Sequence, residues 1–270
     1  MINYKRIKKE ELFFRIKIIF LSISIDVKIM AVIDYLWMIL ALMGSYVIGS
    51  IPFSIWLGKL AKGIDLRKHN VGNPGGMNAI LTYGMLLGVP IMLLDFFKGT
   101  VVIALIDHIF SLEHFSSQGP NNFWHTFVCL LGPLFCAIGH SYSVFLKFNG
   151  GQGLGVFMGV LIYLNPLVFL IHVILITLLM ASKKFTVRIA SFIVALLDVI
   201  AMALIPFVPP WNFLPQNPLI LNETFLQLKA ALSIFILGLG LVVRMLHTIK
   251  LKSKSAAWKI AEKGEQKFKN

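Results

Sequence analysis

A glycine-rich stretch in the middle of the chain is the first place where residue types and spacing suggest chemistry. Residues 147–155 read KFNGGQGLG and lie between two apolar runs. Glycines let backbone N–H groups approach an anion closely, and N–H groups at the start of a helix point toward one. We therefore expect Gly150, Gly151 and Gly153 to shape a phosphate-binding turn, with Gln152 as an uncharged hydrogen-bond donor. The spacing is not that of the nucleotide P-loop.

A second set of candidates lies in the segment 49–84, which combines polar side chains with glycines. Successive backbone N–H groups around glycine form a nest that binds phosphate, and Arg67 would add positive charge. The alternative is an ordinary positively charged loop with turn glycines. The candidates in this segment are Ser50, Asp65, Arg67, Gly72, Asn73, Gly75 and Asn78.

Polar residues within or beside apolar runs complete the candidates. His140 lies near the end of one run and is either a hydrogen-bonded packing residue or part of a site. Asp95 and Lys98 are spaced i, i+3, so they share one helix face and can pair, either at a functional site or as a structural ion pair. Arg188 and Ser191 begin another run, where an arginine could reach a shared anion.

The elements that must position these residues are membrane helices. Hydrophobic residues make up 57% of the 270-residue chain, whereas soluble domains hold about 45–50% apolar residues even with glycine counted. The apolar runs are long enough to cross a hydrocarbon core of roughly 30 Å. They cover about 31–58, 85–106, 124–145, 155–182, 189–208 and 226–246. The sequence predicts an all-α integral membrane protein.

Charge predicts the orientation of these helices. Lys and Arg outnumber Asp and Glu by 25 to 12, and the positive-inside rule explains this excess without a nucleic-acid partner. The segments 107–123 and 209–225 carry no Lys or Arg. The basic segments are 59–84, 146–154, 183–188 and the tail from Arg244. We therefore expect the basic segments, and with them the candidate site, to face the cytoplasm.

The run 155–182 predicts a broken helix. Both of its flanks are basic, so an even number of passes must separate them, but 28 residues are too few for two full spans. Pro166 follows Asn165 inside the run and removes a helix hydrogen bond. We expect a half-membrane helix at 155–164 and a returning helix at 166–182, covered by protein. The total is about seven helices, with the C-terminus in the cytoplasm.

The two ends of the chain differ from the membrane domain, which we place at 30–247. Residues 1–29 hold seven basic residues and form a basic extension. They are an interfacial amphipathic helix, a poor extra span or an over-long translation start. If translation starts near Met30, the N-terminus lies outside. Residues 248–270 form a basic cytoplasmic tail.

Three stretches of the chain resemble, in order and spacing, the acyl-phosphate-dependent glycerol-3-phosphate acyltransferases of bacterial membranes. They read GSIPFSIWLGK with GIDLRKHNVGNPGGMN, then DFFKG, then GHSYSVFLKFNGGQG. The resemblance covers roughly residues 44–192 and implies seven membrane helices with cytoplasmic active-site loops. It further implies transfer of an acyl group from acyl phosphate to the 1-hydroxyl of glycerol 3-phosphate, giving lysophosphatidate for phospholipid synthesis.

The resemblance also implies surroundings and roles. It implies a multi-pass protein of the bacterial cell (inner) membrane, among membrane lipids, with no metal or other cofactor and a functional link to an enzyme that forms acyl phosphate. The candidate catalytic residues are Arg67, Asn73, Asn78 and His140. The candidate phosphate-binding residues are Ser50, Gly72, Gly75, Gly150, Gly151, Gln152, Gly153, Arg188 and Ser191. Asp65, Asp95 and Lys98 would support them.

The chain departs from the family pattern at several positions. Val71, Met77 and Leu81 stand where the first motif has serine, threonine and arginine, Asn149 and Gln152 replace two lysines, and Ser143 replaces a usual proline. Charged hydrogen bonds are roughly twice as strong as neutral ones, so these losses should weaken the binding of glycerol 3-phosphate. Three alternatives stay open: an enzyme that is weak or has changed its acceptor, a silent membrane paralogue that binds a lipid phosphate or a partner, and a small transporter.

Overall fold

The structure is a computed structural model of the whole chain, and its description covers most of the membrane domain. The described residues are 33, 35–70, 72–110, 123–185, 187–205, 232, 234–240 and 242. The basic extension 1–29 and the tail 248–270 lie outside them, as does much of the predicted run 226–246. The chain divides into two compact units, Met1–Leu40 and Ala41–Asn270. Residues 35–40 of the first unit are helical, and the site lies in the second.

The regular structure of the described residues is entirely helical. Residues 41–50 open the second unit as a helix, and residues 234–240 are helical as well. The elements between them are α2 (Phe53–Lys62), η1 (Leu66–Lys68), α3 (Gly76–Tyr83), α4 (Met85–Phe110), α6 (Phe123–Ser141), η2 (Val144–Leu146), α7 (Leu154–Leu164), α8 (Pro166–Ala181) and α9 (Val187–Leu204). The predicted all-α architecture is confirmed for this part of the chain.

Three helical stretches are long and apolar enough to cross a membrane. They are Tyr35–Lys62, Met85–Ile106 and Val128–Leu146, whereas α7, α8 and α9 are shorter apolar helices. The first stretch differs from the uninterrupted run that we expected at 31–58, because the backbone leaves the helix at Ile51 and Pro52 and resumes in α2. Proline has no N–H to continue the helix. The number of spans, expected to be about seven, stays a prediction.

The predicted broken helix is confirmed at Asn165. α7 ends at Leu164, and Asn165 caps α8, its Oδ1 accepting hydrogen bonds from the N–H groups of Leu167 and Val168 at 3.1 and 3.2 Å. The Asn165 amide also donates to the carbonyl of Ile205 at 3.1 Å. The polar ends at the break are therefore satisfied by protein, as a break within a bilayer requires.

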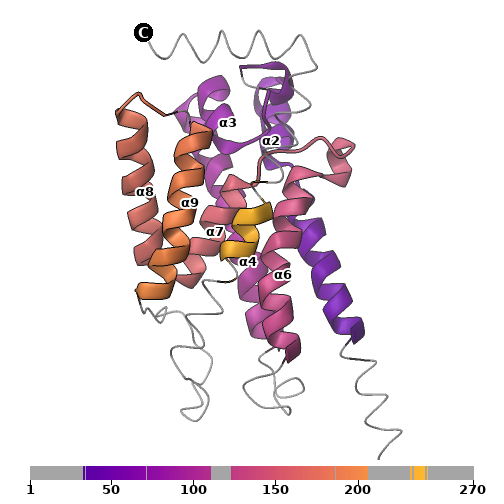
Figure 1. The fold of residues 1–270 in the computed structure, drawn as a ribbon. Helices are drawn as coiled ribbons and strands as arrows, with labels where there is room; N and C mark the ends of the chain where they lie inside the picture. The colour runs from indigo at the N-terminus through magenta and orange to yellow at the C-terminus, as the bar shows by residue number, and fades with distance from the viewer. Residues whose placement is uncertain are drawn as a thin grey trace, which may run out of the picture. The chain divides into compact units, whose positions relative to one another are not determined.

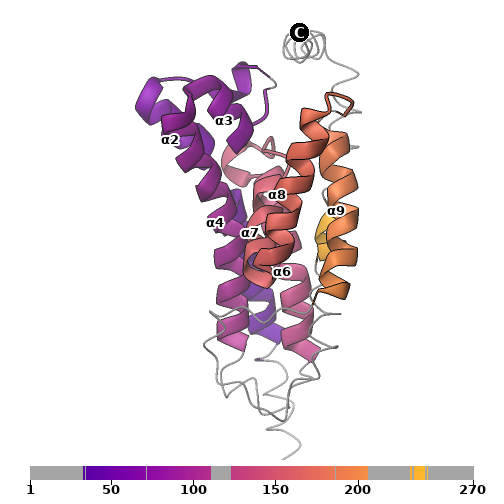
Figure 2. The ribbon, with the colours of Figure 1, turned by 90° about the vertical axis from the view of Figure 1, so that its left-hand side faces the viewer.

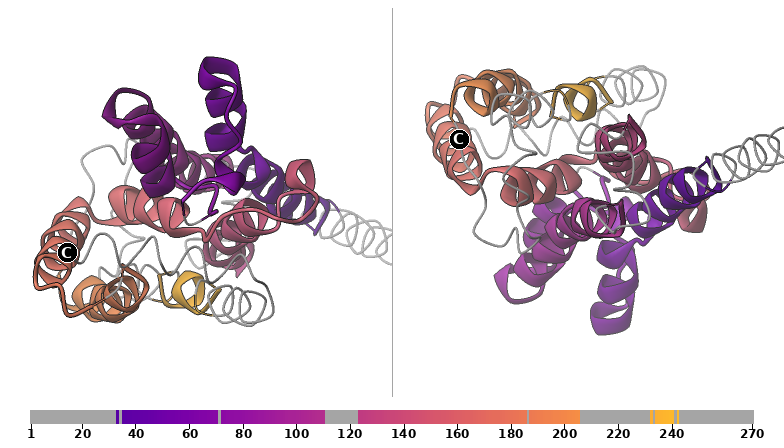
Figure 3. Two further views of the ribbon diagram at one scale, coloured as in Figure 1. Left: turned by 90° about the horizontal axis from the view of Figure 1, so that it is seen from above. Right: turned by 90° about the horizontal axis from the view of Figure 1, so that it is seen from below.

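α7 is the central helix of the second unit. Its residues 156–161 are all buried, and it packs against α4, α6 and α8, while α8 packs against α9 (Figure 3). α4 and α7 approach closely because glycines face the partner backbone. A Cβ atom on Gly99 would lie 2.2 Å from the carbonyl oxygen of Val156, and one on Gly155 would lie 2.8 Å from the Asp95 side chain. Small residues at this contact bring the start of α7 beside Asp95.

The segments that carry the candidate residues lie at one end of these helices. α2, α3 and the loop between α6 and α7 are at the upper end of Figures 1 and 2, where α8 ends and α9 begins. The end of α4 and the start of α6 are at the opposite end (Figure 1). Three of the four basic segments that we expected on a common side, 59–84, 146–154 and 183–188, therefore lie at one end of the second unit. The fourth, the tail from Arg244, is outside the described residues.

Candidate active site

The helix break at Pro52 leaves backbone carbonyls that a side chain from α4 then satisfies. Lys98 Nζ donates to the carbonyl oxygen of Ile51 at 2.9 Å and lies 3.4 Å from that of Gly49. A broken helix end leaves carbonyls without intrahelical partners, so a buried cation is a suitable partner for them. This contact joins α4 to the break.

A second contact at the break comes from the loop after α6. Ser143 Oγ donates to the carbonyl oxygen of Ser50 at 2.6 Å, and Ser50 Oγ donates to that of Gly139 at 3.3 Å. Ser50 and Ser143 are both buried. Ser143 was not among the predicted site residues, although its departure from the family's proline is visible in the sequence and could have marked it.

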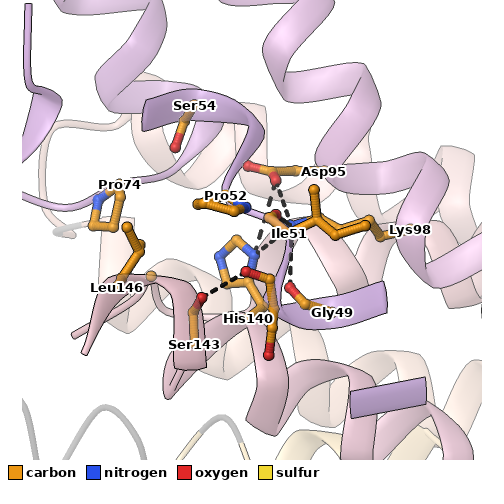
Figure 4. Close-up of a pocket in the computed structure, with 12 residues that line it drawn as sticks. Gly49, Ile51, Pro52, Ser54, Pro74, Asp95, Lys98, His140, Ser143 and Leu146 are labelled. Atoms are coloured by element: carbon orange, nitrogen blue, oxygen red, sulfur yellow. Dashed lines mark hydrogen bonds and ion pairs between the residues drawn. The ribbon is translucent and has the colours of Figure 1, made fainter. Parts of the chain in front are cut away.

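Lys98 is the centre of a buried polar cluster with Asp95 and His140. Its Nζ lies 2.9 Å from Asp95 Oδ1 and 3.1 Å from His140 Nδ1 (Figure 4). All three residues are buried: Asp95 and Lys98 are each 3% exposed and His140 is 7% exposed. Asp95 Oδ2 has no hydrogen-bond partner among the described residues. The cluster therefore combines the predicted Asp95–Lys98 pair with a histidine from α6.

The glycine turn lies directly against His140. Gly150 and Gly151 donate backbone hydrogen bonds to the carbonyls of Ser141 and His140, at 3.1 and 3.0 Å. A Cβ on Gly151 would lie 2.2 Å from His140 Nε2. Gly153, in the left-handed region with φ of 85°, precedes the first residue of α7. The turn thus brings the positive end of the α7 dipole next to the polar cluster. The N–H groups of Gly150 and Gly151, which we expected to face a phosphate, donate to protein carbonyls here, so the binding of phosphate by this turn stays a prediction.

These groups line a small pocket (Figure 4). Of the predicted site residues it holds Ser50, Asp95, Lys98, His140 and Gly151, together with Gly49, Ile51, Pro52, Ser54, Pro74, Ser143 and Leu146. The lining comes from the first helix break, α2, the loop before α3, α4 and the segment around the glycine turn. Four segments that are distant in the sequence, within 49–54, at Pro74, within 95–98 and within 140–151, therefore meet at one polar hollow.

Arg67 is not part of this lining, because it pairs with Asp65 in the loop after α2. Its Nε and Nη2 donate to the two carboxylate oxygens at 3.1 and 2.8 Å, and Lys59 lies 3.6 Å from the same carboxylate. The guanidinium hydrogen bond holds the pKa of Asp65 well below its usual range, and the pKa of Arg67 is raised by the same contact. The catalytic role predicted for Arg67 stays a prediction.

Asn78 organises the loop that leads to the pocket. Its amide nitrogen lies 3.2, 3.3 and 2.9 Å from the carbonyl oxygens of Leu66, His69 and Asn73, and the residue is 2% exposed. These three acceptors are spread along the loop between α2 and α3, so the Asn78 side chain fixes the conformation of this loop. The loop ends at Pro74, which lines the pocket.

The two predicted glycines of this loop serve its geometry. Gly72 has φ of 65°, a conformation that favours glycine. Gly75 caps α3, and a Cβ there would lie 3.0 Å from the amide nitrogen of Asn73. Both positions shape the approach to Pro74 rather than the pocket wall.

The remaining predicted residues adjoin the pocket or lie away from its lining. Gln152 follows Gly151 and is partly exposed. Arg188 lies in the first turn of α9, and its side chain is outside the described residues. Ser191 is buried on α9, and its Oγ has no partner in the described part of the chain.

Helices that contain a break, a glycine turn at the start of an inner helix and a buried Asp–Lys–His cluster define a helical membrane protein with a buried polar site. A family model described as glycerol-3-phosphate acyltransferase matches residues 39–254. The chain belongs to this glycerol-3-phosphate acyltransferase family, which confirms the resemblance seen in its motifs.

Individual relatives agree with this assignment. The glycerol-3-phosphate acyltransferase of Acholeplasma laidlawii is 34% identical over 166 residues, 60% of this chain and 69% of the relative. That of Bacillus subtilis is 35% identical over 156 residues, 58% of this chain and 73% of the relative. The crystal structure of PlsY (YgiH), an integral membrane glycerol 3-phosphate acyltransferase in its glycerol 3-phosphate form, matches with a TM-score of 0.56 and 25% identity over 79% of this chain and 90% of that one. The all-α membrane fold is thereby confirmed.

Proposed function

We propose that this chain transfers an acyl group from acyl phosphate to the 1-hydroxyl of glycerol 3-phosphate, forming lysophosphatidate for phospholipid synthesis. Family membership supports the acyl transfer to glycerol 3-phosphate. The observation that carries the proposal is the buried Asp95–Lys98–His140 cluster, which lines a pocket beside the glycine turn at the start of α7.

The proposed reaction exchanges one carbon–oxygen bond for another. The hydroxyl oxygen of glycerol 3-phosphate forms a bond to the acyl carbonyl carbon, and the bond from that carbon to the phosphate oxygen breaks. The products are lysophosphatidate and inorganic phosphate, and the phosphate carries the proton that the hydroxyl has lost. Acyl phosphate is already activated, so the protein needs no covalent nucleophile. Its work is to position two phosphates and stabilise developing negative charge.

Two described features suit that work. Lys98 places a positive charge at the pocket wall, and the start of α7, the positive end of its helix dipole, lies beside Asp95 of the same cluster. Charges and dipoles held in place before the reaction lower its barrier because they need no reorganisation. Candidate roles for Arg67, Asn73, Asn78, Arg188 and Ser191 remain part of this proposal.

The site would work at the cytoplasmic face of a bacterial cell membrane. The basic segments that flank it support this orientation through the positive-inside rule, as does the predicted cytoplasmic C-terminus. Glycerol 3-phosphate would enter from the cytoplasm. Acyl phosphate would come from an enzyme that forms it, which is the functional partner that the reaction requires.

The departures from the family pattern predict a weaker hold on glycerol 3-phosphate. Gln152 lies beside the pocket with a neutral amide in place of a lysine, and Leu81 is 43% exposed on α3, outside the pocket lining. A neutral side chain at 152 removes a charge–phosphate contact from the turn. We expect an active enzyme with a high Michaelis constant for this acceptor.

The test is direct product formation. The purified full-length protein in lipid nanodiscs is incubated with acyl phosphate and labelled glycerol 3-phosphate, and lysophosphatidate is measured. Lys184→Gln, on the exposed turn after α8, serves as the matched control and should behave like the wild type, whereas Lys98→Met should lose the product. If a folded wild-type protein forms no lysophosphatidate, the silent paralogue replaces this proposal. If product forms only from an acyl thioester, the assigned donor is wrong.

A further inference from the structure

We propose that His140 acts on bound substrate as a neutral hydrogen-bond donor through Nε2, and that Lys98 sets this tautomer. The identity of the substrate rests on the proposed function, but the tautomer rests on the geometry of the cluster alone. The proposal assigns a role to each of the two imidazole nitrogens and excludes one common role for histidine, that of the base.

The first step concerns the hydrogen bonds of Lys98. An ammonium group has three N–H donors and no lone pair. Three acceptors lie within 3.1 Å of Nζ: Asp95 Oδ1 and the carbonyl oxygen of Ile51, both at 2.9 Å, and His140 Nδ1 at 3.1 Å. The Gly49 carbonyl is more distant, at 3.4 Å. Each of the three N–H groups therefore has one close acceptor, and the contact with His140 requires a lone pair on Nδ1.

The second step concerns the other protonation states of the pair. A neutral lysine could accept from an Nδ1–H, but Asp95 would then be a buried carboxylate without a cation, which is costly. An imidazolium would direct an Nδ1–H at the ammonium, so two donors would face each other. His140 Nδ1 lies 3.8 Å from Asp95 Oδ1, too far for a hydrogen bond that would favour that form. A charged Lys98 with a neutral His140 pairs the Asp95 carboxylate with a cation and gives each N–H of Lys98 an acceptor, and no two donors face each other.

The third step concerns the direction of the remaining nitrogen. A neutral imidazole with a lone pair on Nδ1 carries its proton on Nε2. Nε2 faces the glycine turn, since a Cβ on Gly151 would lie 2.2 Å from it, and both residues line the pocket. Phosphate and acyl oxygens are acceptors, so an Nε2–H suits either. Nε2 has no lone pair with which to take the proton of the acceptor hydroxyl.

The first test reads the tautomer without any activity measurement. Nitrogen NMR of the full-length protein with labelled histidine distinguishes a protonated ring nitrogen from an unprotonated one. The chain has seven histidines, so the His140 signals are identified as those missing from the His140→Gln spectrum. We expect a single neutral form, protonated at Nε2, at neutral pH. Lys98→Met should convert it to a mixture of tautomers. A His140 protonated at Nδ1, alone or as imidazolium, would overturn the proposal.

The second test uses a matched pair of nearly isosteric substitutions. In His140→Gln the amide oxygen can accept from Lys98 and the amide nitrogen can still donate, whereas His140→Glu keeps an acceptor and a base but offers no N–H. We expect His140→Gln to retain turnover within about thirtyfold of the wild type and His140→Glu to lose at least about a hundredfold, both folded by thermal unfolding. Higher turnover for His140→Glu than for His140→Gln would assign a base to this position and overturn the proposal.

The two tests separate this inference from the proposed function. A wild-type protein that forms no lysophosphatidate, while its His140 is protonated at Nε2, contradicts the acyl transfer and supports the tautomer. An active enzyme whose His140 is protonated at Nδ1 contradicts the inference and leaves the acyl transfer intact.

Discussion

In the part of the chain that the structure describes, two groups of ionisable side chains are buried among the helices, and they differ in their surroundings. The Asp95–Lys98–His140 cluster joins α4 and α6 to backbone carbonyls at a helix break and lines a pocket. The second group joins α8 to α9, where His172 Nδ1 lies 2.6 Å from Asp198 Oδ2 and both residues are 1% exposed.

The difference between them separates a site from a structural contact. Beside His172 lies the ring of Phe157, with the ring centroids 6.0 Å apart, and neither His172 nor Asp198 lines the pocket described above. A buried charge is expensive in both places. At the Asp95–Lys98–His140 cluster, a helix break, glycines and a pocket adjoin the charge, so a ligand can contact it. The His172–Asp198 pair joins α8 to α9 and is covered by Phe157 of α7, so we infer that it fixes the contact between α8 and α9.

The largest expected effect tests the first cluster. Lys98→Met removes the cation and leaves Asp95 buried without its partner, which should reduce turnover at least about a hundredfold and lower the free energy of unfolding by about 3–5 kcal/mol. Adding Asp95→Asn should recover most of the stability but not the turnover. Turnover is measured as lysophosphatidate formation and stability by thermal unfolding in detergent. Recovery of turnover in the double variant would show that Lys98 and Asp95 only stabilise the fold, as we infer for the His172–Asp198 pair.

A smaller effect is expected from closing the space beside His140. A Cβ on Gly151 would overlap His140 Nε2, so Gly151→Ala should displace the imidazole and reduce turnover about thirtyfold, while the remaining fold is unchanged. Gly44→Ala is the matched control, because a Cβ on Gly44 meets nothing within 4 Å. Equal turnover in the two variants would show that the glycine turn does not need to lie against the cluster.

The ion pair in the loop after α2 provides an intermediate case. Arg67→Ala should reduce turnover about tenfold through loss of the loop's charge and shape, and the charge-swapped variant Asp65→Arg with Arg67→Asp should recover it if only the pair matters. Turnover that stays low after the swap would indicate that Arg67 itself contacts the substrate.

Because the pKa of Asp65 lies well below its usual range, mainly through the Arg67 hydrogen bond, the contribution of the Asp65–Arg67 pair to stability is complete at neutral pH. It is lost only as the pH falls below about 4.

Restoring a cation beside the pocket should give a gain. Gln152→Lys adds a charge to a turn that is already shaped, so the Michaelis constant for glycerol 3-phosphate should fall about tenfold, most strongly at low salt. The wild type and the variant are compared over a series of salt concentrations. An unchanged or higher constant, with the native activity damaged, would indicate that Gln152 binds a less charged acceptor.

The smallest effect on turnover is expected from the second buried group. His172→Leu leaves the Asp198 carboxylate buried without its partner and should destabilise the protein by about 3–5 kcal/mol, whereas adding Asp198→Leu should restore stability. The folded double variant should keep turnover within about twofold. A loss of tenfold or more in a stable double variant would make the His172–Asp198 pair part of the active site and remove the contrast drawn above.

Several features of the fold and the site follow from local sequence. Asn165 and Pro166 predicted the break between α7 and α8, because a capping side chain and a residue without an N–H act on their immediate neighbours. The spacing of Asp95 and Lys98 predicted their pairing, since i and i+3 always share a helix face. The glycines at 150–153 predicted a tight turn. The break at Pro52 was missed, although its proline carried the same signal.

The sequence by itself determined the helices, the break at Asn165, the glycine turn and the motifs that show the family, because each depends on residues a few positions apart. Only the tertiary structure decided which of these meet. His140 contacts Lys98 across 42 positions, Ser143 bonds to Ser50 across 93, and His172 finds Asp198 across 26. No helical period relates such residues, so their contacts follow from how the helices pack. Arg67 lies outside the pocket lining and pairs with Asp65 two positions away, which its charge alone did not predict.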